Sequence, residues 1–187
     1  SCTDAAVGYY SEGTYWLNSN IVIADQQVAC PAGTYQDQTG QSSCDDAAAG
    51  YYSIGTTGGA NVASSVTTVA TSQIPCAAGT YSNYVTTTPS SDRASCTDAE
   101  TGYYSPGTVG ATGVTVTTIA SSQTPCAAGT YSVQNTTLTT GLSGAASCTD
   151  AAAGYYSEGT VTDATTGVTT VATSQTPCAA GKYQADT

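Results

Sequence analysis

The sequence predicts a small, disulfide-rich, mainly β and irregular fold. We expect an elongated array of tandem repeats, built from short strands and turns around no large core. Three observations carry this prediction: large apolar side chains are scarce, eight cysteines occur in fixed contexts, and one phrase recurs four times. No stretch of useful length has the hydrophobic periodicity of an α-helix.

The hydrophobic residues are too small to build a thick core. The chain has 187 residues and contains neither Phe nor Met, and most of its hydrophobic 40% is Ala, Val, Tyr and Cys. Burying a large apolar side chain contributes about 1.5–3 kcal/mol, and few such side chains are present. We therefore expect a thin structure held by covalent links.

The eight cysteines are not accompanied by any histidine. Evenly spaced cysteines without His and without clustered CxxC pairs are typical of disulfides, and disulfides are typical of an oxidising, extracellular compartment. The sequence therefore predicts that all eight take part in disulfides and that the protein has no metal site.

Four repeats are visible, each made of two half-repeats. We place the repeats at residues 1–42, 43–94, 95–146 and 147–187. The first halves read CTDAAVGYYS, CDDAAAGYYS, CTDAETGYYS and CTDAAAGYYS, and the second halves read QVACPAGTYQ, QIPCAAGTYS, QTPCAAGTYS and QTPCAAGKYQ. Repeats of this length indicate an array in which each unit contacts mainly its neighbours.

Every half-repeat contains a glycine followed two residues later by a tyrosine. The glycines are Gly8, Gly33, Gly50, Gly79, Gly102, Gly129, Gly154 and Gly181. Such a glycine suits a turn with positive φ, and the tyrosine then lies on a short extended segment. The ring is expected to pack on a cystine; the alternative is a platform on which a sugar stacks.

Runs of Val and Thr separate the halves and predict further strands, because they are β-branched and bounded by Gly, Asn or Pro. They lie at residues 20–26, 65–72, 114–122 and 167–174.

The phrases CPAGTYQ and CAAGTYS resemble the cysteine-rich repeats of the ephrin-receptor-like and TNF-receptor-like class. Such repeats occur in surface proteins of ciliates and algae and in the shaft proteins of flagellar hairs, the mastigonemes. The class usually has the pattern C-x-x-C-x-x-G-x-Y. Here the first halves carry Ala at the second cysteine position, and the second halves carry Gln at the first. The alanines are Ala5, Ala47, Ala99 and Ala151, and the glutamines are Gln27, Gln73, Gln123 and Gln175.

The resemblance implies a disulfide pairing between consecutive half-repeats, namely Cys30–Cys44, Cys76–Cys96 and Cys126–Cys148. On the same rule each Ala faces a Gln, so whole disulfides are missing and no orphan thiol is left between them. Cys2 and Cys178 remain over, and they become candidates for a link between copies or for continuation of the chain. A rival pairing stays within each repeat, as Cys2–Cys30, Cys44–Cys76, Cys96–Cys126 and Cys148–Cys178.

Catalytic chemistry is poorly represented. The absence of His excludes His-based nucleophilic catalysis, and one Lys with one Arg gives little means to clamp a phosphate. We expect no enzyme activity, no catalytic residue and no cofactor. The acidic pairs Asp45/Asp46 and Asp98/Glu100 are interpreted as turn residues, with weak calcium binding and glycoside hydrolysis as alternatives.

The net charge of −11 disfavours nucleic acid as a partner. No apolar run is long enough for a membrane span. The chain begins with Ser, so we expect a processed protein or a segment of a longer one.

Glycans are expected on the polar loops, because Ser and Thr make up roughly 30% of the chain. Asn135-Thr136-Thr137 is an N-glycosylation sequon. Candidate O-glycosylation sites are Thr86, Thr87, Thr88, Thr136, Thr137, Thr139 and Thr140; the alternative is a plain solvated loop.

The aromatic stretch around Trp16, the only Trp, is either a local core or an anchor at an interface. Together these features favour a structural subunit of an extracellular, glycosylated filament that assembles head to tail with copies of itself, like a flagellar hair. The alternative is a binding module of a cell-surface antigen or receptor ectodomain.

Overall fold

The computed structural model describes residues 2–17, 20–22, 26–57, 68–84, 90–109, 118–133 and 144–184. It divides into two compact units. The first comprises Ser1–Ile74 and Tyr84–Ser95, and the second comprises Pro75–Asn83 and Cys96–Thr187.

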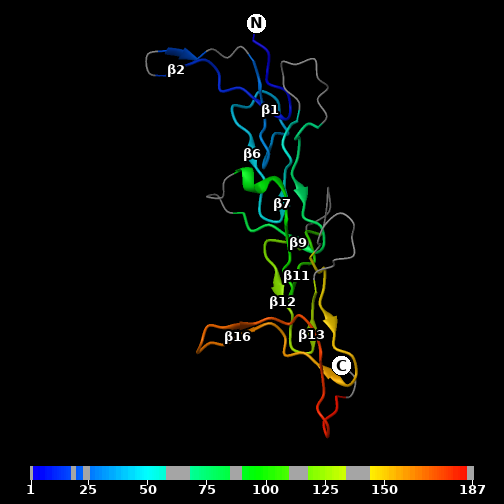
Figure 1. The fold of residues 1–187 in the computed structure, drawn as a ribbon. Coiled ribbons are helices and arrows are strands. Elements are labelled where there is room, and N and C mark those ends of the chain that lie inside the picture. Colours follow the sequence, from blue (N-terminus) through cyan, green and yellow to red (C-terminus); the bar gives the residue numbers. More distant parts are fainter. Residues whose placement is uncertain are drawn as a thin grey trace. The chain divides into compact units, whose positions relative to one another are not determined.

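The regular structure consists of very short strands (Figure 1). Seven pairs join consecutive half-repeats: β1 (Tyr9–Tyr10) with β4 (Val28–Ala29), β5 (Thr34–Tyr35) with β6 (Asp45–Asp46), β7 (Tyr51–Tyr52) with β8 (Ile74–Pro75), β9 (Thr80–Tyr81) with β10 (Thr97–Asp98), β11 (Tyr103–Tyr104) with β12 (Thr124–Pro125), β13 (Thr130–Tyr131) with β14 (Thr149–Asp150), and β15 (Tyr155–Tyr156) with β18 (Thr176–Pro177). The part of the chain that the structure describes has no α-helix, and its helical segment η1 (Ser90–Ala94) is 3₁₀. The predicted small, disulfide-rich, mainly β fold is confirmed.

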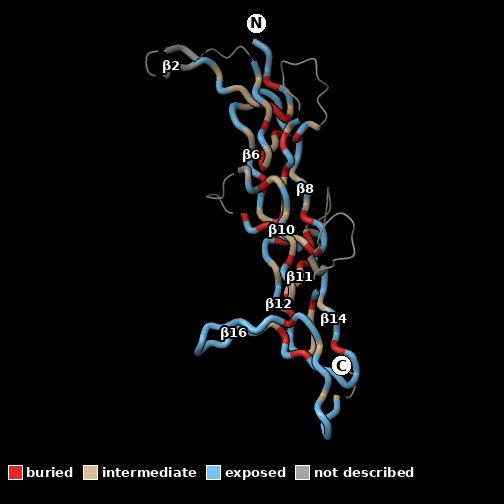
Figure 2. The backbone as a smooth tube through the Cα atoms, in the orientation of Figure 1, coloured by how far each residue is buried: buried red, intermediate tan, exposed pale blue. Residues whose placement is uncertain are grey.

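Two local hairpins lie outside this scheme. β2 (Tyr15–Leu17) pairs with β3 (Asn20–Val22), and β16 (Val161–Thr162) pairs with β17 (Thr169–Thr170). They fall in or beside two of the predicted Val/Thr strands. The runs at 65–72 and 114–122 are described only in part, where Thr68 and Thr118 form isolated bridges. In the second unit, the β16–β17 hairpin reaches outward into solvent, and all of residues 161–170 are exposed (Figure 2).

The glycine of every half-repeat has the predicted positive φ, between 77° at Gly8 and 88° at Gly79 and Gly129. The turn at this glycine is closed by a hydrogen bond such as that from Thr34 N to Pro31 O at 3.0 Å. The chain then enters the short strand that contains the tyrosine of the G-x-Y phrase, which we call the Tyr strand. A side chain with a Cβ adopts this conformation only at a cost, which explains glycine at this place.

The buried residues, red in Figure 2, mostly have small side chains. The fourth position of the half-repeat, where the class has its second cysteine, is buried in the first seven halves as Ala5, Cys30, Ala47, Cys76, Ala99, Cys126 and Ala151. The residue after the tyrosine of the G-x-Y phrase is buried in six of the eight half-repeats, as Gln36, Ser53, Ser82, Ser105, Ser132 and Ser157. Of the eight tyrosines of the G-x-Y phrase, six are only partly buried, while Tyr156 and Tyr183 are exposed. The thin core expected from the composition is therefore present, and most of its residues are Ala, Cys and Ser.

Buried serines satisfy their hydroxyl groups by bonding back to the preceding half-repeat. Ser105 Oγ donates to Thr80 O and Ser157 Oγ donates to Thr130 O, both at 2.8 Å. Because each hydroxyl has a main-chain partner, the interior tolerates these polar side chains. Consecutive half-repeats are thus held by strand pairing, by these serine bonds and by the links described next.

Candidate functional site at the junctions between half-repeats

We number the half-repeats 1 to 8 in chain order and call the contact between one half and the next a junction. At each junction, the Tyr strand of one half lies beside the second and third positions of the next half. In the register of junction 2, Thr34 lies opposite Asp46 and Tyr35 opposite Asp45. The same register recurs as Thr80 opposite Asp98 and as Thr130 opposite Asp150.

Even-numbered junctions carry a disulfide. The structure forms Cys30–Cys44, Cys76–Cys96 and Cys126–Cys148, with Cα–Cα distances of 5.8, 5.8 and 5.7 Å. Of the two pairings that the sequence left open, this is the one between consecutive half-repeats. The cysteine of each second half is almost fully buried, at 0% exposure for Cys30 and 1% for Cys76 and Cys126.

Odd-numbered junctions carry a hydrogen bond in place of the disulfide. The side-chain oxygen of the Gln accepts the main-chain N–H of the residue that follows the buried Ala. The four bonds are Ala6 N to Gln27 Oε1 at 2.7 Å, Ala48 N to Gln73 Oε1 at 2.8 Å, Glu100 N to Gln123 Oε1 at 2.7 Å, and Ala152 N to Gln175 Oε1 at 2.7 Å. Ala and Gln therefore occupy the two places of the cystine and hold the same junction without a covalent bond.

Small residues let the halves approach closely. At Gly55 a Cβ would lie 2.5 Å from the main-chain nitrogen of Ala32, and Gly107 and Gly159 show the same distance to Ala78 and Ala128. The glycine of the S-x-G-T phrase thus rests against the backbone of the preceding half-repeat. A methyl group there would force the two halves apart.

The predicted acidic pairs take structural roles. Their interpretation as turn residues was wrong for the aspartates, whereas Glu100 begins a turn, since its main-chain oxygen accepts the N–H of Tyr103 at 3.0 Å. Asp45 and Asp46 form β6, and Asp98 ends β10. They are extended because the preceding half-repeat supplies a strand beside them, a partner that local sequence cannot reveal. Asp46 Oδ2 lies 3.2 Å from Nη1 of the buried Arg93, and Glu100 Oε2 accepts a bond from Gln123 Nε2 at 3.1 Å.

Arg93 was not predicted as a functional residue. It binds the segment Tyr84–Ser95, which precedes junction 4, to the rest of the first unit. Its side chain is 4% exposed, and Nη1 donates to Ala47 O at 3.1 Å. Its main-chain oxygen accepts the N–H of Ser53 at 3.0 Å. Tyr84 lies nearby in sequence; its hydroxyl donates to Ser95 O, and burial raises its pKa, with Asp92 adding to the effect and Arg93 opposing it.

Cys2 and Cys178 are free, Cys2 exposed and Cys178 partly buried. Cys178 is the exception among the fourth-position residues, which are otherwise buried. Its half-repeat has no following half within the given sequence, and among the described residues no strand lies beside it as β6 lies beside β5. These two cysteines are the unpaired members of the pattern.

Half-repeat 8 also has an open strand edge. Lys182 and Tyr183 stand where the other second halves have β5, β9 and β13. Among the described residues no strand pairs with them, and Tyr183 is 87% exposed. The turn before them is nevertheless formed, with Lys182 N bonding Ala179 O at 3.0 Å. At the other end, Thr3 and Asp4 stand where β6, β10 and β14 would be, and both are exposed.

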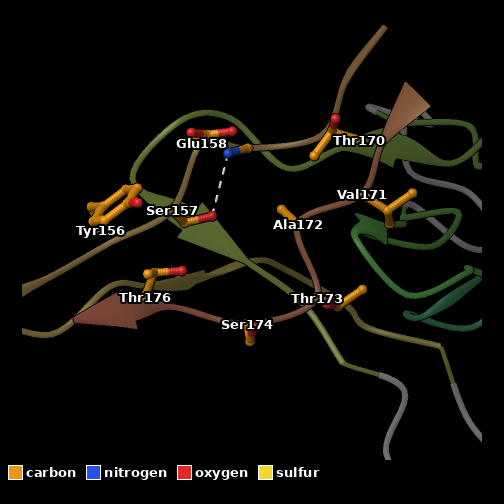
Figure 3. A pocket seen from close by; sticks show the side chains of 10 residues that line it. Tyr156, Ser157, Glu158, Thr170, Val171, Ala172, Thr173, Ser174 and Thr176 are labelled. Carbon is orange, nitrogen blue, oxygen red and sulfur yellow. Dashed lines mark hydrogen bonds between the residues drawn. The ribbon is translucent and has the colours of Figure 1, made fainter. Parts of the chain in front are cut away.

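A pocket of ≈ 240 Å³ lies in the second unit (Figure 3). It opens between the segment Tyr156–Gly159 and the segment Thr170–Ser174, and Ser157 lines it. In earlier repeats the N–H of the corresponding serine bonds a loop carbonyl: Ser53 N bonds Arg93 O and Ser105 N bonds Ala145 O. Ser157 N has no such acceptor within the described ranges.

Other expected sites fall elsewhere. Trp16 lies in β2, with its main chain opposite Ile21, and its side chain is outside what the structure describes. The glycosylation candidates, Asn135 and Thr86, Thr87, Thr88, Thr136, Thr137, Thr139 and Thr140, also lie outside the described residues. Within the described ranges, no helix is long and apolar enough to cross a membrane, and no three acidic or cysteine side chains gather as metal ligands.

Comparison of the chain with protein-family models and with curated proteins finds no match in either case.

Proposed function

We propose that the chain is a structural subunit of an extracellular filament in which copies join head to tail. The observation that carries the proposal is the complementarity of half-repeats 8 and 1. Half-repeat 8 has the free Cys178 and an unpaired edge at its G-x-Y tyrosine. Half-repeat 1 has the free Cys2 and an exposed segment, Thr3–Asp4, at the positions that pair with the tyrosine strand in three internal junctions. A contact of this head-to-tail kind, repeated without closing on itself, generates a fibre.

Several features support an extracellular structural role. The three disulfides are typical of secreted proteins, and they compensate for the thin core. The charged and polar side chains at the junctions are used to hold half-repeats together. The resemblance to the repeats of flagellar-hair shafts points in the same direction.

Glycans on Asn135 and on the Thr-rich loops are part of this proposal. They would cover polar loops that lie between the half-repeats in sequence. The intact mass of the natural protein tests this part: a mass above the 18.5 kDa of the bare chain supports it, and the bare mass removes it.

Electron microscopy of the purified chain tests the filament proposal. The sample is concentrated under oxidising conditions and imaged alongside a sample in which both free cysteines are replaced by Ser. Filaments or linear chains of copies are expected with the natural cysteines. A strictly monomeric particle at high concentration contradicts the proposal and favours a binding module of a surface protein, for which the exposed β16–β17 hairpin would be the contact surface.

A further inference from the structure

The open edge of half-repeat 8 carries the only lysine of the chain. In the three internal junctions of the same type, the residue before the strand Tyr is Thr34, Thr80 or Thr130. In half-repeat 8 it is Lys182, which is exposed. The register of all three internal junctions places this residue opposite the third-position Asp of the next half-repeat.

We propose that the edge Lys182–Tyr183 binds Thr3–Asp4 of a second copy as an antiparallel strand pair, in which Lys182 and Asp4 form an ion pair that exists only at the joint between copies. Tyr183 then lies opposite Thr3, as Tyr131 lies opposite Thr149 inside the chain. This inference rests on the proposed function and names the residues that select the partner.

The main chain around Lys182 and Tyr183 has the conformation that paired half-repeats have. Lys182 N bonds Ala179 O at 3.0 Å, as Thr130 N bonds Ala127 O at 3.0 Å in half-repeat 6. Cys178 N bonds Gly154 O at 2.9 Å, as Cys126 N bonds Gly102 O at 2.9 Å. Half-repeat 8 therefore has the local conformation of a half whose partner is in place, and little ordering is needed on binding.

Half-repeat 1, the proposed partner, also has the space that an internal junction requires at its S-x-G-T glycine, Gly13. A Cβ at Gly13 meets nothing within 4 Å, whereas at the corresponding Gly55 and Gly159 it would meet the main-chain nitrogen of the residue two places after a Cys. In half-repeat 8 the residue in that place is Ala180, and it is exposed. Gly13 of a second copy is the residue that would rest against it.

Charge gives the joint its specificity. The chain has a net charge of −11, so two copies repel each other at long range. Arg93 is committed to Asp46 within the chain, and Lys182 is the remaining cationic side chain. A cation placed opposite Asp4 favours the contact between half-repeats 8 and 1 over other contacts between acidic surfaces.

A disulfide completes the joint. In the internal junctions the strand pair is accompanied by a bond between a fourth-position Cys and the first-position Cys of the next half. Docking places the Cys178 thiol and the partner copy's Cys2 thiol in that relation. Their oxidation by a small-molecule disulfide forms one S–S bond, and the two protons and two electrons convert the oxidant into two small thiols.

The association constant of the full 187-residue chain tests the inference. It is measured by sedimentation equilibrium in a background with Cys2→Ser and Cys178→Ser, so that only noncovalent contacts count. The variants are Lys182→Glu, Asp4→Lys and the two together. Each single variant is expected to weaken association about 3- to 10-fold, because the ion pair becomes a like-charge pair. The double variant is expected to return to within about twofold of the background, and its net charge is that of the background.

Two further measurements test the ion pair and the close approach of Gly13: association in high salt and association of a glycine variant. In high salt the difference between background and single variants should shrink, since exposed charges are screened. Gly13→Ala should weaken the association of copies. Within a single copy it should lower the thermal stability of the first unit only by the strain of placing Ala at a positive φ, because a Cβ there meets nothing within 4 Å. Equal association for all charge variants would overturn the ion pair while leaving the filament proposal standing, because the background would still associate. No association of the background and of the oxidised natural chain would overturn both.

Discussion

Gln123 and Glu100 are joined by two hydrogen bonds: Gln123 Oε1 accepts the N–H of Glu100 at 2.7 Å, and Gln123 Nε2 donates to Glu100 Oε2 at 3.1 Å. They stand at a junction where the neighbouring junctions have a cystine. The carboxamide of a Gln thus holds two half-repeats together across the same gap.

Replacing Gln123 by Ala is expected to destabilise the second unit by about 0.5–1.5 kcal/mol, because the N–H of Glu100 loses its acceptor in exchange for water. Chemical denaturation followed by tyrosine fluorescence measures this change. Ser122→Ala, at the exposed residue beside Gln123, serves as the control and should change stability little. Equal stability of Gln123→Ala and the natural chain would show that the carboxamide is dispensable.

The missing cystine can be restored. The double variant Ala99→Cys, Gln123→Cys places thiols at the two positions that carry disulfides in the other junctions. It should form a fourth bond under oxidising conditions and raise the free energy of unfolding of the second unit by about 3 kcal/mol, mainly by constraining the unfolded chain. Mass spectrometry of the unreduced digest detects the bond, and reduction provides the reference state. Two free thiols at these positions after oxidation would argue against the equivalence of the two kinds of junction.

Gly55 and Gly13 form a matched pair, with φ of 76° at both. Replacement by Ala costs backbone strain of about 1 kcal/mol at each position. At Gly55 the new methyl group also meets Ala32 N at 2.5 Å, whereas at Gly13 it meets nothing within 4 Å. Thermal unfolding should therefore show a clearly larger loss for Gly55→Ala, and similar losses for both would contradict the close approach of half-repeats 2 and 3.

The β16–β17 hairpin should depend on pH through Asp163. Its Oδ1 accepts the main-chain N–H groups of Thr165 at 2.7 Å and Thr166 at 3.2 Å, and these bonds lower the pKa of Asp163 below its ordinary value of 3.8. A lowered pKa means that the charged form stabilises the turn above the ordinary value, and that this contribution is lost as the pH falls through the lowered pKa. Amide exchange at Thr165 and Thr166, corrected for intrinsic rates, should therefore speed up in acid. Asp163→Asn should remove this pH dependence; its persistence in the variant would assign it to another group.

Much of the fold could be predicted from the repeats. The glycines of the G-x-Y phrase predicted positive φ because no other residue adopts it as readily, and all eight have it. The composition predicted a thin interior, and Ala5, Cys30 and Ser105 show its kind. These features are local or compositional, so a single sequence is sufficient to reveal them.

Features that depend on distant partners could not be predicted in the same way. Asp45 and Asp46 look like turn residues, but a strand from the preceding half-repeat extends them. The hydrogen bond from Ala6 N to Gln27 Oε1 uses a main-chain donor. Every residue type except Pro has such an N–H group, so the sequence does not reveal which one the Gln side chain binds. Arg93 reaches Asp46 across a long stretch of chain, with no local pattern to announce it.

The disulfide between copies is the most direct test of the account. Chains labelled with ¹⁵N and unlabelled chains are mixed, oxidised with glutathione disulfide and digested without reduction. The account predicts a peptide containing Cys178 linked to one containing Cys2, with about half of the linked pairs combining a labelled and an unlabelled partner, as random pairing of copies requires. Linked pairs of a single isotope would show that the bond closes within one chain, and a peptide joining Cys2 to Cys30 would show that the cysteines pair within a repeat; either result would contradict head-to-tail assembly.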